Sequence, residues 1–242
     1  MIDIGPIGLV IFARMDSSRL PGKALMDIAG RPMLGRVLDC CREARRVDTY
    51  IIATSDRAVD NPIQDFAETE GAAVFRGDGD DVLGRACAAA EAHGLTHLVR
   101  ISGDSPFMRS DVIDAIVEVH LASGAEITTN IAPRTFPPGL SVEALTRQAL
   151  QRLDREAVDA EDREHVTRFV YRHADTFDVH NVESGHVEWA DCALTVDTGD
   201  DLEFARRLAE RIDAAPGAPL GDWVAMADEE RQPAPAAARG LA

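Results

Sequence analysis

The stretch IGLVIFARMDSSRLPGKALMDIAGRPMLGRVLDCCREAR, residues 7–45, decides the fold. It opens with a short apolar run, residues 7–12, whose β-branched side chains are typical of a strand buried on both faces of a parallel sheet. A polar loop follows, and residues 33–45 then place apolar side chains at helical spacing after Pro32, which favours a helix start. The stretch therefore predicts a strand, a loop and a helix.

The same alternation continues along the first half of the chain. Short apolar runs predict strands at 50–53, 73–75 and 97–101, and periodic segments predict helices at 63–70, 81–93 and 111–122. Such alternation is typical of an α/β layer fold with a mostly parallel sheet, in which ligands bind at the carboxyl ends of the strands. The loops that follow Phe12, Ala53 and Ile101 should therefore share one edge of the sheet.

The second half of the chain is less regular. It contains a proline-rich segment at 133–138, and the patterns predict helices at 145–153 and 163–173, a strand at 193–197 and a last helix at 201–212. We interpret this half as a lid and a dimerising or acceptor-binding insertion within one domain, residues 1–213. Residues 214–242 are rich in proline and alanine, which predicts a frayed, partly disordered tail.

The charge balance restricts the class of partner. The chain has 42 acidic and 25 basic residues and a net charge of −17. Binding to a nucleic acid or to an anionic membrane surface needs a broad cationic face, so neither partner is expected. A small anionic ligand is compatible with this charge, because a local cluster of arginines outweighs distant, screened carboxylates.

The cysteines and the N-terminus point to a reducing compartment. Cys40, Cys41, Cys87 and Cys192 lack both the CxxC spacing of a zinc or redox site and the density of a disulfide scaffold, so we expect reduced, mostly buried thiols. The apolar run near the N-terminus is too short for a signal sequence or a membrane span. A cytoplasmic protein is the resulting expectation.

The loop at residues 13–23, ARMDSSRLPGK, concentrates positive charge. Two arginines and the only lysine among the 25 basic residues lie in it. A triphosphate carries about four negative charges, which arginine forks and a lysine point charge can neutralise, while small residues let backbone N–H groups approach. The spacing is neither that of a P-loop nor GxGxxG. We expect nucleotide contacts from Ala13, Arg14, Ser17, Ser18, Arg19, Gly22 and Lys23; the alternative is a solvated surface loop.

The segment ARMDSSRLPGKALMDIAGRPML, residues 13–34, resembles the opening signature of the cytidylyltransferases that make CMP-activated sugar acids. These are the acylneuraminate and 3-deoxy-manno-octulosonate cytidylyltransferases and, most closely, their spore-coat polysaccharide relatives. The resemblance covers residues 7–205. It implies a single-domain nucleotide-diphospho-sugar transferase fold, a Rossmann-like three-layer fold, with CTP as the nucleotide and a homodimer. It also implies that Arg14, Arg19 and Lys23 contact the phosphates.

Two aspartates are candidates for a divalent metal, which nucleotidyl transfer needs because negative oxygens shield the α-phosphorus. Magnesium (Mg2+) prefers one or two carboxylates together with waters and phosphates. Asp104 lies in SGDSP after a predicted strand, and Asp197 ends the predicted strand at 193–197. Both positions match metal-binding positions of the resembled family. The alternatives are a turn-forming role for Asp104 and a helix-capping role for Asp197.

A rival carboxylate pair lies in GDGDD. Asp78 and Asp80 spell the DxD pattern with which glycosyltransferases of a related fold hold their metal. A three-letter pattern is weak in a chain with 42 acidic residues, and carboxylates are favoured at a helix N-terminus in any case.

Four further residues complete the predicted site. Arg85 lies on the first turns of a predicted helix, and the resemblance implies that its segment holds the base or the triphosphate. Ser102 stands where related enzymes contact nucleotide or acceptor with a different residue. Arg134 and His165 are candidates for acceptor binding, although the first is also an ordinary loop arginine and the second is also typical of a structural or dimer-contact histidine.

These observations predict a magnesium-dependent nucleotidyltransferase that moves CMP from CTP to a sugar, sugar acid or related acceptor and releases pyrophosphate. Arg14, Lys23 and Asp104 are the predicted catalytic residues, acting by positioning and electrostatic stabilisation. Three alternatives remain: a glycosyltransferase that uses Asp78 and Asp80, a non-catalytic nucleotide-binding protein of the same fold, and a transferase that prefers another nucleotide.

Overall fold

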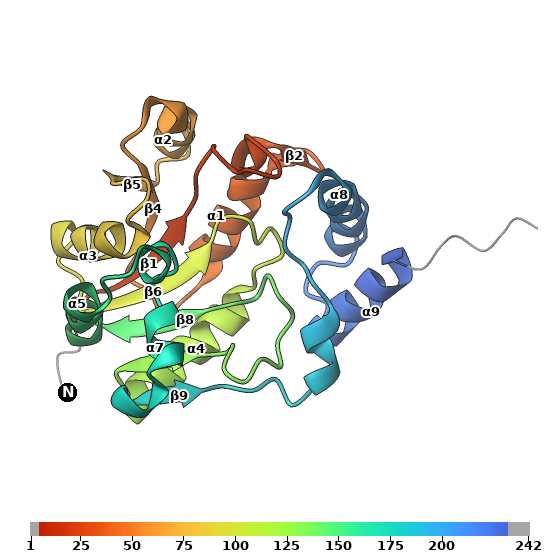
Figure 1. The fold of residues 1–242 in the computed structure, drawn as a ribbon. Helices are drawn as coiled ribbons and strands as arrows, with labels where there is room; N and C mark the ends of the chain where they lie inside the picture. Colours follow the sequence, from red (N-terminus) through yellow and green to blue (C-terminus); the bar gives the residue numbers. More distant parts are fainter. Residues whose placement is uncertain (1–4, 232–242) are drawn as a thin grey trace, which may run out of the picture.

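A central β-sheet organises the computed structural model, which describes residues 5–231. Its strands are β1 (Ile7–Phe12), β4 (Thr49–Ser55), β5 (Ala73–Gly77), β6 (His97–Ser102), β7 (Ile127–Thr129), β8 (Glu143–Thr146) and β9 (Val179–Asn181). The seven strands lie in the order β5-β4-β1-β6-β8-β7-β9 (Figure 1). The first four of these are parallel to one another, whereas β8 runs antiparallel to both of its neighbours. The sheet is therefore mostly parallel, as predicted.

Helices cover both faces of this sheet (Figure 1). They are α1 (Met33–Glu43), α2 (Asn61–Thr69), α3 (Val82–Ala92), α4 (Ser110–Ser123), α5 (Arg147–Glu156), α6 (Ala160–Glu164), α7 (Arg168–Arg172), α8 (Gly199–Asp213) and α9 (Leu220–Arg231). A small hairpin pairs β2 (Asp27–Ile28) with β3 (Arg31–Pro32) between β1 and α1. This arrangement confirms the predicted α/β layer fold.

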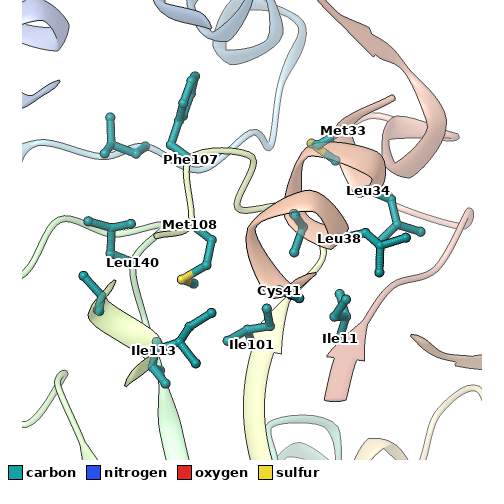
Figure 2. Packing of buried hydrophobic residues seen from close by; sticks show 14 of the residues in the cluster. Ile11, Met33, Leu34, Leu38, Cys41, Ile101, Phe107, Met108, Ile113 and Leu140 are labelled. Carbon is teal, nitrogen blue, oxygen red and sulfur yellow. The ribbon is translucent and has the colours of Figure 1, made fainter. Parts of the chain in front are cut away.

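The alternation of side chains along β1 divides the core into two clusters. Leu9 and Ile11 point to one face and pack with α1, α4 and α8, whereas Val10 points to the other face and packs with α3, α5 and α7. Figure 2 shows Ile11 and Ile101 of the adjacent strands β1 and β6 facing apolar side chains of α1. Because residues 7–11 of β1 are buried, the strand is a rigid base for the loop that follows it.

The register of the strands brings three loops to one edge. Phe12, the last residue of β1, is paired with Ala53 of β4 on one side and with Ser102, the last residue of β6, on the other. The loops after β1, β4 and β6 therefore start side by side, which confirms the prediction that they share one edge of the sheet.

Three expectations for the second half are wrong in detail. The helix expected at 145–153 starts later, because residues 143–146 form β8 and α5 begins at Arg147. The helix expected at 163–173 is divided into α6 and α7 by residues 165–167. Residues 193–197 form no strand but an extended segment, since its backbone bonds go singly to Pro138 and Asp104 rather than to a neighbouring strand.

The tail predicted at residues 214–242 is not frayed over most of its described residues, which are 214–231. Residues 220–231 form α9, which packs against α8 and buries Val224 and Ala227. Arg109 fixes the turn before α9 by donating to the Ala218 carbonyl at 2.9 Å and by lying over the Trp223 ring. Residues 232–242, the rest of the predicted tail, lie outside the described residues.

The cysteines carry no disulfide in the described residues. All four thiols are free, with Cys41 and Cys192 buried and Cys40 and Cys87 half-buried. Burial raises the pKa of Cys87 to about 12 and keeps its thiol protonated. Within residues 5–231, no helix is long and apolar enough to cross a membrane.

Candidate active site

The loop after β1 is folded by its own backbone and by a buried carboxylate. The Ala13 N–H donates to the Ala53 carbonyl at 3.2 Å, and the Gly22 N–H donates to the Met15 carbonyl at 2.8 Å, which closes the loop on itself. Gly22 has φ 78°, a left-handed conformation in which glycine avoids the strain of a side chain. Between these points, the Met15 N–H donates to Asp60 Oδ1 at 2.6 Å. The charged side chains of the loop thus project from a fixed backbone.

This loop forms one wall of a cavity of about 480 Å³ at the carboxyl edge of the sheet. Five cationic side chains line the cavity: Arg14, Arg19, Lys23, Arg85 and Arg100. Of the predicted site residues, the cavity brings together Ala13, Arg14, Ser17, Ser18, Arg19, Lys23, Arg85, Ser102, Asp104 and His165. Segments far apart in the sequence thus concentrate positive charge in a chain whose net charge is −17.

Lys23 links the two predicted metal ligands. Its Nζ donates to Asp197 Oδ1 at 2.9 Å, to Asp104 Oδ2 at 3.3 Å and to the Val196 carbonyl at 2.7 Å. Arg19 adds a second cation on Asp197 at 2.9 Å, although its side chain is largely exposed. The two carboxylates therefore converge on a single cationic atom, as two ligands of one metal ion must.

The donor set suits magnesium. Asp104 and Asp197 supply two carboxylates near one point, and Mg²⁺ is usually held by one or two carboxylates with water and phosphate oxygens. No group of three or more His, Cys, Asp or Glu side chains in the described residues forms a complete protein cage for a metal. The residues present therefore fit a divalent ion shared with a phosphorylated substrate.

A close backbone approach holds Asp104 beside the loop. The preceding Gly103 N–H donates to the Phe12 carbonyl at 2.9 Å, and a Cβ at Gly103 would lie 2.9 Å from the Ala13 Cβ. Only glycine fits here without a shift of the backbone. Its role is thus close packing against the start of the loop.

A helix N-terminus holds Asp197. The Asp197 N–H donates to Asp201 Oδ2 at 3.1 Å, and the same oxygen accepts the Thr198 N–H at 2.8 Å. Thr198 and Asp201 form a reciprocal capping box at the start of α8. Thr198, rather than Asp197, is therefore the cap of this helix.

Arg85 is the most buried cation of the cavity, with 2% of its surface exposed. Its Nη1 donates to the Asp78 carbonyl, while its Nε has no hydrogen-bond partner in the described residues. Burial, and then the nearby charge of Arg14, lower the pKa of Arg85 to about 10, so the guanidinium is charged at neutral pH. A buried, incompletely satisfied cation at a cavity wall is suited to an anionic ligand.

His165 and Arg134, the predicted acceptor residues, are placed differently. His165 lines the first cavity and also a second one of about 370 Å³. Arg134 lines neither of them and donates to Ser141 Oγ at 3.0 Å. Burial lowers its pKa. Gly22 and Asp197 also lie outside the lining of the first cavity, although Asp197 is bonded to two of its cations.

The rival pair in GDGDD has other partners. Asp78 Oδ1 accepts the N–H groups of Asp80 and Asp81, and these backbone bonds lower its pKa. Asp80 forms an ion pair with Arg57 at 2.6 Å. Neither Asp78 nor Asp80 lines the described cavities, so the structure uses both in the turn before α3.

Sequence reasoning missed three residues. Arg100 lies in β6 and lines both cavities, and it pairs at 2.5 Å with Glu143, a fully buried carboxylate that also accepts from Tyr171. The signal in the sequence was an arginine between two apolar residues, Val99 and Ile101, within a predicted strand. Glu164 lines the first cavity and pairs with Arg14 at 3.7 Å, and Asp60 accepts the Met15 N–H; neither stands in a metal-binding or phosphate-binding motif, so neither was assigned a role.

Comparisons with known proteins show the family to which the chain belongs. The cytidylyltransferase family model matches residues 9–213. The spore coat polysaccharide biosynthesis protein SpsF of Bacillus subtilis is 28% identical over 223 residues, which cover 90% of this chain and 92% of SpsF. A cytidylyltransferase structure from Leptospira borgpetersenii has a TM-score of 0.87 and 26% identity, covering 93% of this chain and 94% of that one. The fold is shared with CMP:2-keto-3-deoxy-manno-octonic acid synthetase complexed with CTP, at a TM-score of 0.67, 20% identity and coverage of 85% and 99%. The chain therefore belongs to the cytidylyltransferase family and is a CTP-using nucleotidyltransferase.

Proposed function

We propose that this enzyme transfers CMP from CTP to a hydroxyl or acidic oxygen of a sugar or sugar acid and releases pyrophosphate. The observation that carries the proposal is the convergence of five cations and two carboxylates at the edge of the sheet, where the first cavity lies. Such a site neutralises a triphosphate and orders the reacting oxygens, which is the main requirement of phosphoryl and nucleotidyl transfer.

The cations of the first cavity bind and orient the triphosphate. Arg14 is held by the Gly79 carbonyl at 2.6 Å, and its other nitrogens form only long ion pairs, with Asp16 at 3.5 Å and Glu164 at 3.7 Å, which phosphate oxygens would replace. Lys23 contributes a compact charge from the end of the loop, and Arg85 contributes a buried one. Because these groups are held before the substrate arrives, they stabilise the charge that develops on the leaving pyrophosphate with little reorganisation.

Asp104 and Asp197 would hold Mg²⁺, which supplies Lewis-acid polarisation of phosphate oxygens when it is bound. Their own contribution is geometric, since Gly103 sets the position of the first and the capping box of α8 sets that of the second. Lys23, which contacts both, keeps the two like charges close together.

The second cavity is our candidate for the acceptor. It shares Arg100 and His165 with the first cavity, so an acceptor there lies next to the bound nucleotide. The pairing of Arg100 with buried Glu143 fixes its guanidinium at the junction. His165, which lines both cavities, would contact both substrates. Arg134, which donates to Ser141 Oγ and lines neither cavity, stays a predicted acceptor residue.

Pyrophosphate release tests the proposal. The purified enzyme is incubated with each of CTP, UTP, ATP and GTP, with magnesium, and with a panel of neutral sugars, sugar acids and phosphonates. We expect release with CTP and one class of acceptor, and loss of release with EDTA. Release with another nucleotide in preference to CTP would contradict the proposal.

Two variants separate the proposal from the glycosyltransferase alternative. Asp104→Asn should abolish most turnover, whereas Asp78→Asn should retain most of it, because Asp78 binds backbone N–H groups in a turn. The opposite result, together with consumption of a nucleotide sugar, would favour the glycosyltransferase. Binding of CTP without pyrophosphate release for every acceptor would favour a non-catalytic protein.

Two further proposals follow from the same reaction. Because the enzyme consumes a nucleoside triphosphate, we propose a cytoplasmic location. We also propose a homodimer, as the family resemblance implies, and light scattering on the purified protein checks it.

A further inference from the structure

Asp60 is a fully buried carboxylate beside the phosphate loop, with none of its surface exposed. It lies at the junction of a 3-10 helix, Ala58–Asp60, and α2, and it is not among the residues that line the cavities. Its Oδ1 accepts the Met15 N–H at 2.6 Å, and its Oδ2 accepts the N–H of Ser55 at 3.2 Å and the Ser55 hydroxyl. A buried carboxylate is costly unless several donors satisfy it, and here three do.

The bond to Met15 connects Asp60 to the middle of the loop. Met15 lies between Arg14 and Asp16, and its carbonyl accepts the N–H of Gly22, near the end of the loop. The backbone of Met15 thus makes two bonds: its N–H donates to Asp60, and its carbonyl accepts the N–H of Gly22 near the end of the loop. Loss of either bond would free the side chains that line the cavity.

Asp60 also provides the negative charge that a buried cation needs. Its side-chain contacts in the described residues are with neutral donors, the N–H groups of Met15 and Ser55 and the Ser55 hydroxyl. Among the carboxylates that keep the guanidinium of Arg85 charged, Asp60 has the largest effect, opposing the burial that lowers the pKa of Arg85. Arg85 therefore depends on the charge of Asp60, and Arg14 directly precedes Met15, whose N–H Asp60 accepts.

We propose that Asp60 is the positioning residue of the nucleotide site: it holds the Met15 peptide, and through it the phosphate loop, in the conformation that binds CTP. This inference rests on the proposed function of the first cavity as the nucleotide site. Asp60 touches no substrate and acts through the loop. Its carboxylate is required because both oxygens accept hydrogen bonds, which no amide of the same shape can do.

The test compares Asp60→Asn with Asp48→Asn. The Asp48 carboxylate accepts the Ile7 N–H at 2.8 Å, so it makes the same kind of bond to the opposite end of β1, far from the cavity. In Asp60→Asn, an amide NH₂ group must face the N–H of Met15 or of Ser55, and one of these donors loses its acceptor. The CTP dissociation constant is measured by calorimetry, KM and kcat by pyrophosphate release, and loop mobility by amide exchange of residues 14–22.

We expect Asp60→Asn to raise the dissociation constant and KM for CTP about tenfold or more, with a smaller change in kcat. Amide exchange of the loop should quicken about tenfold, whereas Asp48→Asn should stay within about twofold of the wild type in every measurement. A purely structural role would lower the amount of active enzyme and hence kcat, with KM unchanged. That result, or an unchanged loop and an unchanged affinity, overturns the proposal.

Failure of the proposed function gives a different pattern. If the wild type releases no pyrophosphate but binds CTP, the CTP dissociation constant and the amide exchange of the loop still test the positioning role of Asp60. If the wild type does not bind CTP, the amide exchange of the loop is the remaining test of whether Asp60 holds the loop. If Asp60→Asn does not fold, Ser55→Ala takes its place, because it removes the hydroxyl bond and keeps the charge. We then expect about twofold to fivefold weaker CTP binding and a more mobile loop, and no change in either would overturn the proposal.

Discussion

At the scale of single residues, the charges of the site meet at Lys23. It is the only lysine of the chain, its side chain is largely buried, and it contacts both Asp104 and Asp197. An ammonium group can approach two carboxylates and a carbonyl at once, whereas a planar guanidinium favours one bidentate partner. The chemical type of this cation therefore matters as much as its charge.

Lys23→Ala should lower kcat/KM about 10²-fold to 10³-fold, because it removes a phosphate-binding cation and leaves two close carboxylates to repel each other. Lys23→Arg should recover only part of this loss. Pyrophosphate release gives the rates, and circular dichroism checks the fold. The matched control is Arg46→Ala, an exposed cation paired with Glu118 away from the cavity, which should retain wild-type rates. Near-normal rates for Lys23→Ala would show that Lys23 is not a catalytic residue.

Gly103→Ala tests the close approach between Asp104 and the loop. The added Cβ would meet the Ala13 Cβ and the Phe12 carbonyl, and backbone cannot move aside as a side chain can. We expect a loss of about 1–3 kcal/mol in the free energy of unfolding and a large fall in kcat. Gly199→Ala is the control, since its Cβ would meet open space. Urea unfolding and pyrophosphate release give the two readouts, and equal stability of the two variants would contradict the packing argument.

The sequence predicts the charged residues that belong to a motif and line the cavity. It does not predict the residues, such as Asp60, that hold the backbone of the motif in place. Ten of the predicted residues line the first cavity, and eight of them belong to ARMDSSRLPGK and SGDSP, which lie at the ends of buried strands and must meet at one edge. Asp60 was missed, because a buried carboxylate that serves backbone N–H groups looks like any other acidic residue in a chain with 42 of them.

At the scale of elements, the start of α8 matters most for the site. Thr198 caps this helix, and Asp201 accepts both the Thr198 hydroxyl and the Asp197 N–H on a single oxygen. The position of the Asp197 carboxylate is thus coupled to the cap. The sequence predicted α8 but assigned a strand to the segment before it, since alternating apolar residues in an extended chain look the same whether or not a neighbouring strand pairs with them.

Thr198→Val should cost about 1 kcal/mol of the free energy of unfolding, the usual value of a lost N-cap, and should lower kcat several-fold because Asp197 shifts. The control is Thr146→Val, which removes the N-cap of α5, where the Thr146 hydroxyl accepts the Ala149 N–H. Both variants should lose similar stability by urea unfolding, but only Thr198→Val should lose activity. Equal activity of the two variants would show that the N-cap of α8 does not position Asp197 for catalysis.

At the scale of the whole molecule, the sequence predicts the parallel half of the sheet better than the rest. Strands β1, β4 and β6 have six or seven residues and alternate with helices, so their pattern is clear. Strands β7, β8 and β9 have only three or four residues, which is too short for a period of two to be distinguished from a helix end. Helix α9 was missed because its proline-rich and alanine-rich surroundings masked two buried positions, Val224 and Ala227.

The stability of the whole fold should depend on pH through a buried histidine pair. His120 on α4 is bonded to His97 of β6 at 3.0 Å and to Thr128 of β7 at 3.1 Å. Burial, and then the neighbouring His97, lower the pKa of His120 to about 4. Since the unfolded chain protonates at the ordinary histidine pKa, stability is full above about pH 6.5 and is lost as the pH falls from there toward about 4.

We expect a loss of about 3 kcal/mol across this range from His120. Urea unfolding at several pH values measures it, and His120→Gln, which keeps a hydrogen-bonding side chain, should flatten the dependence. The exposed His180 is the control position, because His180→Gln should leave the dependence unchanged. A pH profile that is the same in all three proteins would show that acid destabilisation has another origin.

The bond between Lys23 and Asp197 spans 174 positions, and this separation sets an order of assembly during synthesis. The strands that carry the phosphate loop, from β1 to β6, lie within the first 102 residues and leave the ribosome first. Asp197 emerges only when most of the chain has been translated, and the contacts that fix it are among the most distant in sequence, which form slowly. A nascent or interrupted chain can therefore possess the loop without the carboxylate that completes the site, and catalytic competence arrives as one of the last events of biogenesis.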